Sequence, residues 1–552
     1  MNSNNAINNP TDSDRHEILK YLLNIENRSE DFSYIVEAMK PPKDITSICE
    51  KNLGGKAKVA IIGAGEAGLS AAFELRKIGC NITIFEATRR IGGRVYTHYF
   101  DRNKNDFGEL GAMSIPISHE TTWHYINLFN LSTTPLVSNN VNTLFYIRDS
   151  IAANDLKGRN VYKNIYPKFD LSKNESKKRW MELRNLVYEN YLKRIPSNLR
   201  KELVQNKENY SEVIKELDKL TLREAYEKMN FSNEAISMLS LLDGSKGLLN
   251  LSFIESLERY YTEDSKYTYK INDGMINIPI SLYEALSNIN LKGYKGLLKE
   301  DLGEATIKLQ CAVSGIYNLQ NSSKVSIKYN DIITDRDNLE EFDYVICAIP
   351  FTSLRRVEIK PLLTNIKCEA INNMNYEVSQ KTFLYFKERF WEKGRSSKKI
   401  LGGISYTDLP LVSIYYPTNN KTSYKEEGVL LGSYSLGKGA LVLGSEDPKI
   451  QIEDVIRYIG KIHGLSESYL YKNLIDYKSL IWSDIQYIWG AGSYYNSKDK
   501  GLYLDKLKVG EMDNKVYFAG EHISGKHMSQ QGALRSGMVV ANKVAERIAE
   551  NN

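Results

Sequence analysis

Three glycines and one glutamate near the start of the chain have the types and spacing needed to hold a dinucleotide. Gly63, Gly65 and Gly68 form the pattern G-x-G-x-x-G, and Glu86 follows further along. The first glycine permits a tight turn, the second lets the backbone approach a pyrophosphate, and the third lets a helix pack closely on a strand. A carboxylate placed like Glu86 can accept hydrogen bonds from ribose hydroxyl groups. The pattern therefore predicts a dinucleotide-binding site.

The elements that must position these residues are predicted on either side of them. Lys58–Ile62 is a short apolar run typical of a buried parallel strand, and Leu69–Ile78 has helical spacing. Asn81–Phe85 is predicted as a second strand, which ends in Glu86. The first turn of the helix would direct its unpaired N–H groups at the phosphates. This order of elements predicts a Rossmann-like α/β unit.

A second pair of glycines indicates which dinucleotide is bound. Gly92 and Gly93 permit another close approach of the backbone, and Arg94 supplies a cation for a phosphate. Nicotinamide enzymes do not require this second pair. The run from Glu86 to Arg94 resembles E-A-x-x-R-x-G-G-R of the flavin-containing amine oxidase family. We therefore expect FAD rather than NAD.

Composition limits the class of protein. The chain has 552 residues, which is enough for two or three domains. Of these residues, 42% are hydrophobic and 26% are charged. The net charge of +5 is small for this length and favours neither nucleic acid nor a membrane surface as a partner. The polar N-terminus and five scattered cysteines indicate no secretory signal, disulfide framework or metal site. We expect a cytoplasmic protein.

The remaining segments indicate a discontinuous organisation. Asp343–Pro350 and Lys515–Ala519 are predicted strands that return to the first parallel sheet. Thr121–Leu251 is mainly helical and is interpreted as an insertion, which either shapes access to a pocket or serves as a structural cap. Glu377–Leu504 is rich in strands and predicts a second domain.

Motifs along most of the chain resemble the same family and, within it, the branch of L-amino-acid oxidases and amino-acid monooxygenases. From Lys58 onward they include ELGAM, NDGM, VICAIPFTSLRR, SQKTF, LLGSY and YFAGEH…QGALRSG. The resemblance implies a mixed α/β fold with a discontinuous Rossmann-like FAD-binding domain, a mixed-sheet substrate domain and a helical subdomain. The expected parts are an N-terminal helical arm (1–53), the FAD-binding domain (54–96, 299–373 and 506–552), the substrate-binding domain (97–155, 257–298 and 374–505) and the helical subdomain (156–256).

The resemblance also implies which residues hold FAD. Family members with a covalent flavin use a cysteine near the C-terminal motif, and none of the five cysteines lies there. We therefore expect non-covalent FAD. The expected contacts are Gly63, Gly65, Glu66, Ala67, Gly68, Glu86, Ala87, Arg89, Gly93, Arg94, Gly111, Ala112, Met113, Val313, Gly520, Glu521, Gln530, Gln531 and Ala533.

The catalytic residues are implied in the same way. Lys381, in SQKTF, matches the family lysine that holds a water beside the flavin, and Tyr434, in LLGSY, matches the tyrosine that contacts the substrate carboxylate. The expected substrate contacts are Ser114, Leu436, Trp489, Gly492 and Ser529. An amino acid or related amine would pass a hydride to flavin N5, O2 would be reduced to H2O2, and the imine would hydrolyse to an oxo product and ammonia.

Three positions depart from the family. Ser114 stands where amino-acid oxidases have an arginine that clamps the substrate carboxylate, and Ser529 stands where a tryptophan walls the site. Gln531 replaces a common acidic residue. We expect a more open and less cationic pocket, with Arg102 and Lys438 as candidate replacements for the missing cation.

Other functions stay open at this point. A decarboxylating monooxygenase that makes an amide from an amino acid would use the same scaffold. The fold also occurs in GDP-dissociation inhibitors, which bind prenylated GTPases, and a catalytically silent flavoprotein is a further alternative. As partners we expect the small-molecule substrate and O2, and we expect a homo-oligomer, a dimer.

Overall fold

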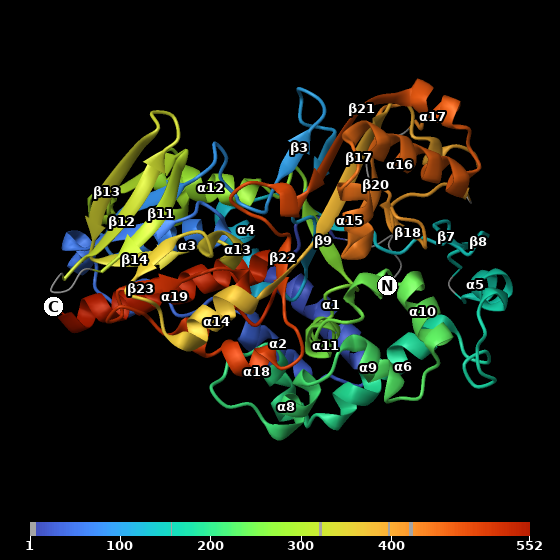
Figure 1. Cartoon of the computed structure of the whole chain (residues 1–552), viewed down its shortest axis with the longest axis horizontal. Coiled ribbons are helices and arrows are strands. Elements are labelled where there is room, and N and C mark those ends of the chain that lie inside the picture. The colour runs from blue at the N-terminus through green and yellow to red at the C-terminus, as the bar shows by residue number, and fades with distance from the viewer. Residues whose placement is uncertain (1–6, 156, 319–322, 396–397, 419–422, 552) are drawn as a thin grey trace.

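The computed structural model describes residues 7–155, 157–318, 323–395, 398–418 and 423–551. Its first layer is a five-stranded parallel sheet built from segments that lie far apart in the sequence (Figure 1). The order is β10 (Ala305–Leu309), β2 (Asn81–Glu86), β1 (Lys58–Ile62), β14 (Tyr344–Cys347) and β23 (Val516–Phe518). The predicted return of two later strands to this sheet is therefore confirmed, and the dinucleotide-binding unit is discontinuous.

Two helices pack closely together beside this sheet. They are α3 (Glu66–Arg76) and α19 (Gln530–Asn551), and every residue of α3 is buried. A Cβ atom at Gly537 would lie 2.2 Å from the carbonyl oxygen of Ala67, so only glycine allows this separation. The Ser70 hydroxyl donates to the carbonyl oxygen of Leu534 at 3.0 Å and joins the two helices. The first and last helices of the dinucleotide-binding unit thus form one packed pair.

A four-stranded sheet lies beside the parallel one (Figure 1). Its order is β13 (Arg336–Phe342), β12 (Val325–Asp331), β11 (Cys311–Tyr317) and β15 (Glu358–Lys360). The rings of Phe85 on β2 and Tyr329 on β12 are 4.8 Å apart and join the two sheets. This contact brings the start of β11 to the edge of the dinucleotide-binding unit.

The third layer is a seven-stranded mixed sheet. Its order is β21 (Leu474–Ile481), β17 (Ser379–Phe386), β20 (Gly428–Leu436), β19 (Ser413–Tyr415), β18 (Ile404–Thr407), β7 (Leu144–Ile147) and β8 (Ser150–Ala153). Neighbouring strands are antiparallel except β18 and β7. Leu384 and Leu430 of this sheet share a separate core with Ile456 and Ile459 of α16 (Pro448–His463). The mixed sheet expected from the sequence is confirmed.

Helices fill the lower part of Figure 1. The insertion contains α5 (Arg159–Asn164), α6 (Trp180–Arg194), α7 (Ser197–Arg200), α8 (Glu212–Asp218), α9 (Leu222–Glu227) and α10 (Asn233–Leu242), and it extends past its expected end at Leu251 into α11 (Phe253–Tyr261). The N-terminal helices α1 (Asp12–Ile25) and α2 (Asp31–Met39) lie against it. Arg15 bonds to Glu120 at 2.9 Å, and Arg28 bonds to Glu263 at 2.6 Å. Buried ion pairs therefore tie this arm to the body.

Shorter elements connect these layers. They are α4 (Glu120–Phe129), α12 (Asn277–Leu286), α13 (Phe351–Leu354), α14 (Asn365–Asn373), α15 (Lys438–Gly444), α17 (Glu467–Asn473) and α18 (Asp499–Tyr503), with β3 (Thr97–Tyr99), β4 (Phe107–Glu109), β5 (Ile115–Pro116), β6 (Thr133–Leu136), β9 (Thr268–Ile271), β16 (Asn375–Glu377) and β22 (Gly492–Tyr494). Among the helices of the described ranges, none is long and apolar enough to cross a bilayer.

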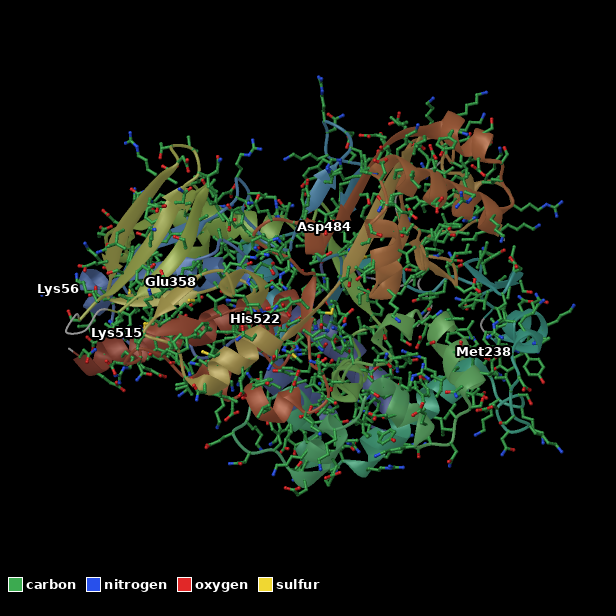
Figure 2. The ribbon with its side chains drawn as sticks, viewed as in Figure 1. Lys56, Met238, Glu358, Asp484, Lys515 and His522 are labelled. Atoms are coloured by element: carbon green, nitrogen blue, oxygen red, sulfur yellow. The ribbon has the colours of Figure 1, made fainter. Side chains whose placement is uncertain are left out.

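The direction of the parallel strands places their carboxyl ends in the interior. Lys56 and Lys515 precede β1 and β23, and Figure 2 shows both at one end of the view. His522 follows β23 and lies near the middle of the same view (Figure 2). In open α/β sheets ligands bind outside the carboxyl ends of the strands. The fold therefore directs the site towards the centre of the molecule.

Candidate active site

One cavity of about 1370 Å³ begins at the carboxyl ends of β1 and β2. Its wall continues along β17 and β20 of the mixed sheet and reaches α6 and α11 of the helical insertion. Pockets for a single small ligand usually measure roughly 300–1,000 Å³. This cavity is larger, as is required of one that holds both a dinucleotide and a substrate.

The loop between β1 and α3 has the geometry that its glycines predict. Gly63 has φ +103°, a conformation that L side chains rarely adopt, and its N–H donates to the carbonyl oxygen of Phe85 at 2.8 Å. A Cβ at Gly68 would lie 2.0 Å from the carbonyl oxygen of Gly63. Gly68 does not line the cavity, because its role is to let α3 approach the loop. Gly65 lines the cavity, and a Cβ there would meet only Gly93, 3.9 Å away.

Glu86 lies on the cavity wall at the end of β2 and is fixed by backbone groups. Its Oε2 accepts from the N–H of Ala64 at 2.9 Å, and its Oε1 accepts from the N–H of Thr88 at 2.9 Å. Arg89, an expected cofactor contact, is exposed and lies off the cavity. Arg90 lines it instead, with bonds to the carbonyl oxygens of Gly93 and Val95. In the pattern E-A-x-x-R-x-G-G-R, which begins at Glu86, the first arginine falls on residue 90. The spacing therefore favours Arg90 over Arg89 as the cofactor contact.

The second glycine pair runs beside the first loop. The N–H of Gly92 donates to the carbonyl oxygen of Ala64 at 2.8 Å, and Gly93 has φ +57°. Arg94 follows on the cavity wall, and its guanidinium bonds to Glu521 at 2.5 Å. Its charge is therefore balanced by a carboxylate, and a contact between Arg94 and a phosphate stays a prediction.

Glu521 is the centre of a buried hydrogen-bond network. It accepts from the Ser493 hydroxyl at 2.6 Å and from the N–H of Met528 at 2.8 Å, in addition to the Arg94 bond. Burial alone would raise the pKa of this carboxyl, but Arg94 and the nearby histidines outweigh it and lower the pKa to about 2. The charged pair ties β22 and the segment before α19 to the second glycine loop.

The start of α19 borders the cavity through Gln530 and Ala533. Gln530 donates through Nε2 to Glu66 at 2.6 Å, while its buried Oε1 has no hydrogen-bond partner among the described residues. Burial raises the pKa of Glu66 to about 8, against the opposing effects of Gln530 and Arg94. A neutral carboxyl at this position does not repel phosphates. Gln531 lies off the cavity, because its amide bonds instead to backbone groups of Met39 and Thr121.

These residues fit a dinucleotide such as FAD. Gly65 and Gly93 leave an uncovered backbone, Glu86 presents a fixed carboxylate, and Gln530 carries an unpaired acceptor. The remaining expected contacts on the cavity wall are Ala67, Ala87, Gly111, Ala112, Met113, Val313 and Gly520. The polar groups on the wall, the volume of the cavity and its position at the carboxyl ends of the strands are all consistent with a bound dinucleotide.

Lys381 lies further along the cavity and is 3% exposed. Its Nζ donates to the carbonyl oxygens of Glu109 at 2.9 Å and Gly111 at 2.6 Å. Burial lowers the pKa of Lys381 to about 7, and the Glu109 carboxyl opposes this shift only in part. A lysine that changes charge near neutral pH, with two backbone acceptors fixing its position, is suited to proton transfer.

The sequence interpretation missed Glu109, although it lies in ELGAM. Its carboxyl accepts from the N–H of Met275 at 2.7 Å and from the Thr97 hydroxyl at 2.9 Å. Burial raises the pKa of Glu109 to about 7, while those bonds and Lys381 lower it. Trp482, also missed, donates through Nε1 to the carbonyl oxygen of Leu110 at 2.9 Å. Both residues fix the segment 109–111, whose carbonyl groups hold Lys381.

The expected substrate contacts separate into two groups. Tyr434, Ser114, Trp489 and Ser529 line the cavity with Lys381, whereas Leu436 and Gly492 do not. Leu436 is the last residue of β20, and its backbone faces Gly247. Gly492 packs on Met528, since a Cβ at Gly492 would lie 2.6 Å from the Met528 Cγ. The resemblance that implied these two contacts does not show which residues of a strand border the cavity.

The helical insertion forms part of the cavity wall. Trp180 and Arg184 of α6 line it, together with Asp243, which follows α10. Arg184 bonds to Asp243 at 2.9 Å, and Tyr406 lines the cavity with this pair. Of the two interpretations of the insertion, the structure favours the one in which it shapes the pocket.

Comparison with known proteins gives one consistent result. The family model described as flavin containing amine oxidoreductase matches residues 67–545. The L-amino-acid oxidases of Notechis scutatus scutatus and Bungarus fasciatus are each 28% identical to the chain; the first match covers 88% of this chain and 86% of the relative, and the second covers 90% and 88%.

Solved structures show the same fold. Putrescine oxidase bound to putrescine has a TM-score of 0.66 at 16% identity and covers 88% of this chain and 98% of its own. Cyclohexylamine oxidase from Brevibacterium oxydans IH-35A has a TM-score of 0.64 at 15% identity and covers 90% of this chain and 99% of its own.

Proposed function

Because the chain belongs to the flavin-containing amine oxidoreductases, we propose that it is an FAD-dependent oxidase of the C–N bond in an L-amino acid or a related amine. The observation that carries this proposal is the position of Lys381. It is a buried lysine with a pKa of about 7, and it shares one cavity with a glycine loop built for a dinucleotide. Non-covalent FAD is supported by the five cysteines, none of which lies in the C-terminal motif.

Bound FAD would supply the electron acceptor for the carbon that carries the amine, and O2 would take up the electrons as H2O2. The residues of the chain would orient the substrate, move a proton and stabilise charge on the cofactor. Tyr434 and Trp489 would orient the substrate, and Lys381 would hold a water and move a proton at its Nζ. The N–H groups at the start of α19, near Gln530 and Ala533, would stabilise negative charge on the cofactor.

Product analysis tests this function. The purified protein would be incubated with L-amino acids and with their decarboxylated amines, and H2O2, ammonia and the organic product would be measured. An oxidase gives one H2O2 and one ammonia per oxo product. An amide with one fewer carbon and CO2, without H2O2, would identify the decarboxylating monooxygenase instead. A yellow protein that consumes no O2 with any compound would contradict catalysis.

We also propose a cytoplasmic location and a homodimer. The described cysteines are all free, which supports a reducing compartment and hence the proposed cytoplasmic location. The proposed dimer would be tested by sedimentation of the purified holoprotein, where a monomer at micromolar concentration would contradict it.

A further inference from the structure

Several cationic side chains line the cavity, and most of them have a close partner. Arg94 bonds to Glu521, Arg184 to Asp243, and Lys266 to Glu263. Arg90 bonds to carbonyl oxygens of its own loop. Arg259 of α11 differs from these. Among the described residues, no carboxylate lies within 4.0 Å of its guanidinium, and its hydrogen bond to the carbonyl oxygen of His527 is long, at 3.5 Å.

The acidic neighbours of Arg259 lie closer to other groups. Glu258 bonds to Lys526 at 2.6 Å, Asp264 bonds to Lys526 at 2.5 Å, and the Glu255 carboxylate lies 2.8 Å from His527 Nδ1. A partly buried cation is stable only with an anion or strong acceptors nearby. Burial alone would lower the pKa of the Arg259 guanidinium, but Tyr494 and, at longer range, these carboxylates raise it on balance. Its directional N–H donors nevertheless remain available to the cavity.

Arg259 belongs to the same part of the cavity as the expected catalytic residues. It lines the cavity together with Lys381, Tyr434 and Ser529. Burial raises the pKa of Tyr434, and the charge of Arg259 lowers it, which shows that the two groups interact electrostatically. Ser114, exposed on the cavity wall, can give a carboxylate only one neutral hydrogen bond.

We propose that Arg259 binds the carboxylate of the substrate, with Tyr434 as a second donor, so that the substrate is an amino acid rather than a simple amine. The proposal rests on the oxidase function stated above. A guanidinium offers a planar fork that matches a carboxylate. The helical insertion thus supplies the cation that the segment after ELGAM lacks. Arg102 and Lys438, the candidates suggested by the sequence, do not line the cavity.

The test compares amino acids with the amines that remain when their carboxylate is removed. Stopped-flow mixing of the holoprotein under anaerobic conditions gives an apparent Kd and a limiting rate of flavin bleaching for each compound. The wild-type protein should be bleached by amino acids and not by the paired amines. Arg259→Gln should raise the apparent Kd for the amino acid on the order of 10²-fold and leave the limiting rate within a few fold. Arg259→Lys should recover part of the affinity.

A second measurement does not need turnover. Benzoate, a plain carboxylate, would be titrated into the oxidised holoprotein and followed by the flavin absorbance, with benzamide as its neutral counterpart. Wild type should bind benzoate, and Arg259→Gln should lose that binding. The matched control is Arg223→Gln, which removes an exposed arginine of α9 in the same insertion and should leave binding unchanged.

The outcomes separate this inference from the oxidase function. Bleaching by amines alone, or an unchanged Kd in Arg259→Gln, would overturn the role of Arg259 while the oxidase function stands. Wild-type protein that binds neither benzoate nor any amino acid, yet oxidises amines, would also overturn it. Bleaching by no compound at all would contradict the oxidase function and, with it, the inference.

Discussion

Lys381 lies directly opposite Tyr434 in the antiparallel pair β17–β20, and its Nζ is 4.7 Å from the centre of the Tyr434 ring. The ring face attracts the ammonium form, whereas burial favours the neutral amine. The pKa of about 7 for Lys381 shows that burial dominates. One pair of neighbouring strands thus presents a titrating amine and a phenol to the same cavity.

The lowered pKa of Lys381 predicts that the rate of flavin reduction depends on pH. Because its pKa is lowered to about 7, the side chain is charged below that pH and neutral above it. A neutral amine can accept a proton, so the rate of flavin reduction should rise as the pH increases through about 7. Replacing a general base commonly costs roughly 10²–10⁴-fold in rate. Lys381→Met should lose activity within this range, and its rate should no longer show the step near pH 7.

Lys500→Met is the matched control for that experiment. Lys500 is 3% exposed, donates to the carbonyl oxygen of Leu203 at 2.7 Å and lies off the cavity. Burial lowers its pKa as well. The step near pH 7 should persist in this variant. A step that survives in Lys381→Met would assign the titration to another group, such as Glu109 or the substrate amine.

A second prediction concerns Gly65 and the cofactor. A side chain at this position meets only Gly93 in the protein but projects towards the path expected for the pyrophosphate. Gly65→Leu should therefore fold and lack flavin. The visible flavin absorbance of the purified protein measures bound flavin, and circular dichroism measures the fold. Gly55→Leu, at an exposed glycine with no atom within 4 Å of its Cβ, should stay yellow. A folded, fully yellow Gly65→Leu protein would place the cofactor elsewhere.

A third prediction concerns the pair of Arg94 and Glu521 at acid pH. The folded protein lowers the pKa of Glu521 from 4.5 to about 2. The sign follows from linkage: the contribution to stability is complete above about pH 4.5 and is lost as the pH falls towards 2. A difference of this size corresponds to about 3 kcal/mol.

Thermal unfolding checks this third prediction. Glu521→Gln should lower the Tm at pH 7, because Arg94 loses its buried partner, and should make the Tm fall less steeply between about pH 5 and 3. Glu358→Gln removes an exposed carboxylate that pairs with Lys360 and should change neither quantity. Equal slopes for wild type and Glu521→Gln would show that the pair does not control acid stability.

Local signals in the sequence were sufficient for the dinucleotide-binding unit. Gly68 and Glu86 are constrained by neighbours within one strand–helix–strand unit, and Gly63 is constrained by its positive φ. The structure places all three as that unit predicts. The return of β14 and β23 to the first sheet was predictable because continuous apolar runs are typical of strands buried on both faces.

The rest depended on contacts that only the fold creates. Gln531 and Leu436 belong to the right motifs, but neighbouring elements turn them away from the cavity. Arg259 was missed because a single arginine on a helix gives no signal by itself. It becomes notable only when Glu258 and Asp264 are seen to bind Lys526 and Glu255 is seen to lie beside His527.

Anaerobic reduction of the flavin shows whether this protein oxidises amino acids. The purified protein would be freed of oxygen and mixed with L-amino acids and their decarboxylated amines while the visible flavin absorbance band is followed. We predict that an amino acid bleaches this band and that admitted O2 restores it with formation of H2O2. A protein without a flavin band, or one whose band is bleached by dithionite but by no amino acid or amine, would contradict this prediction.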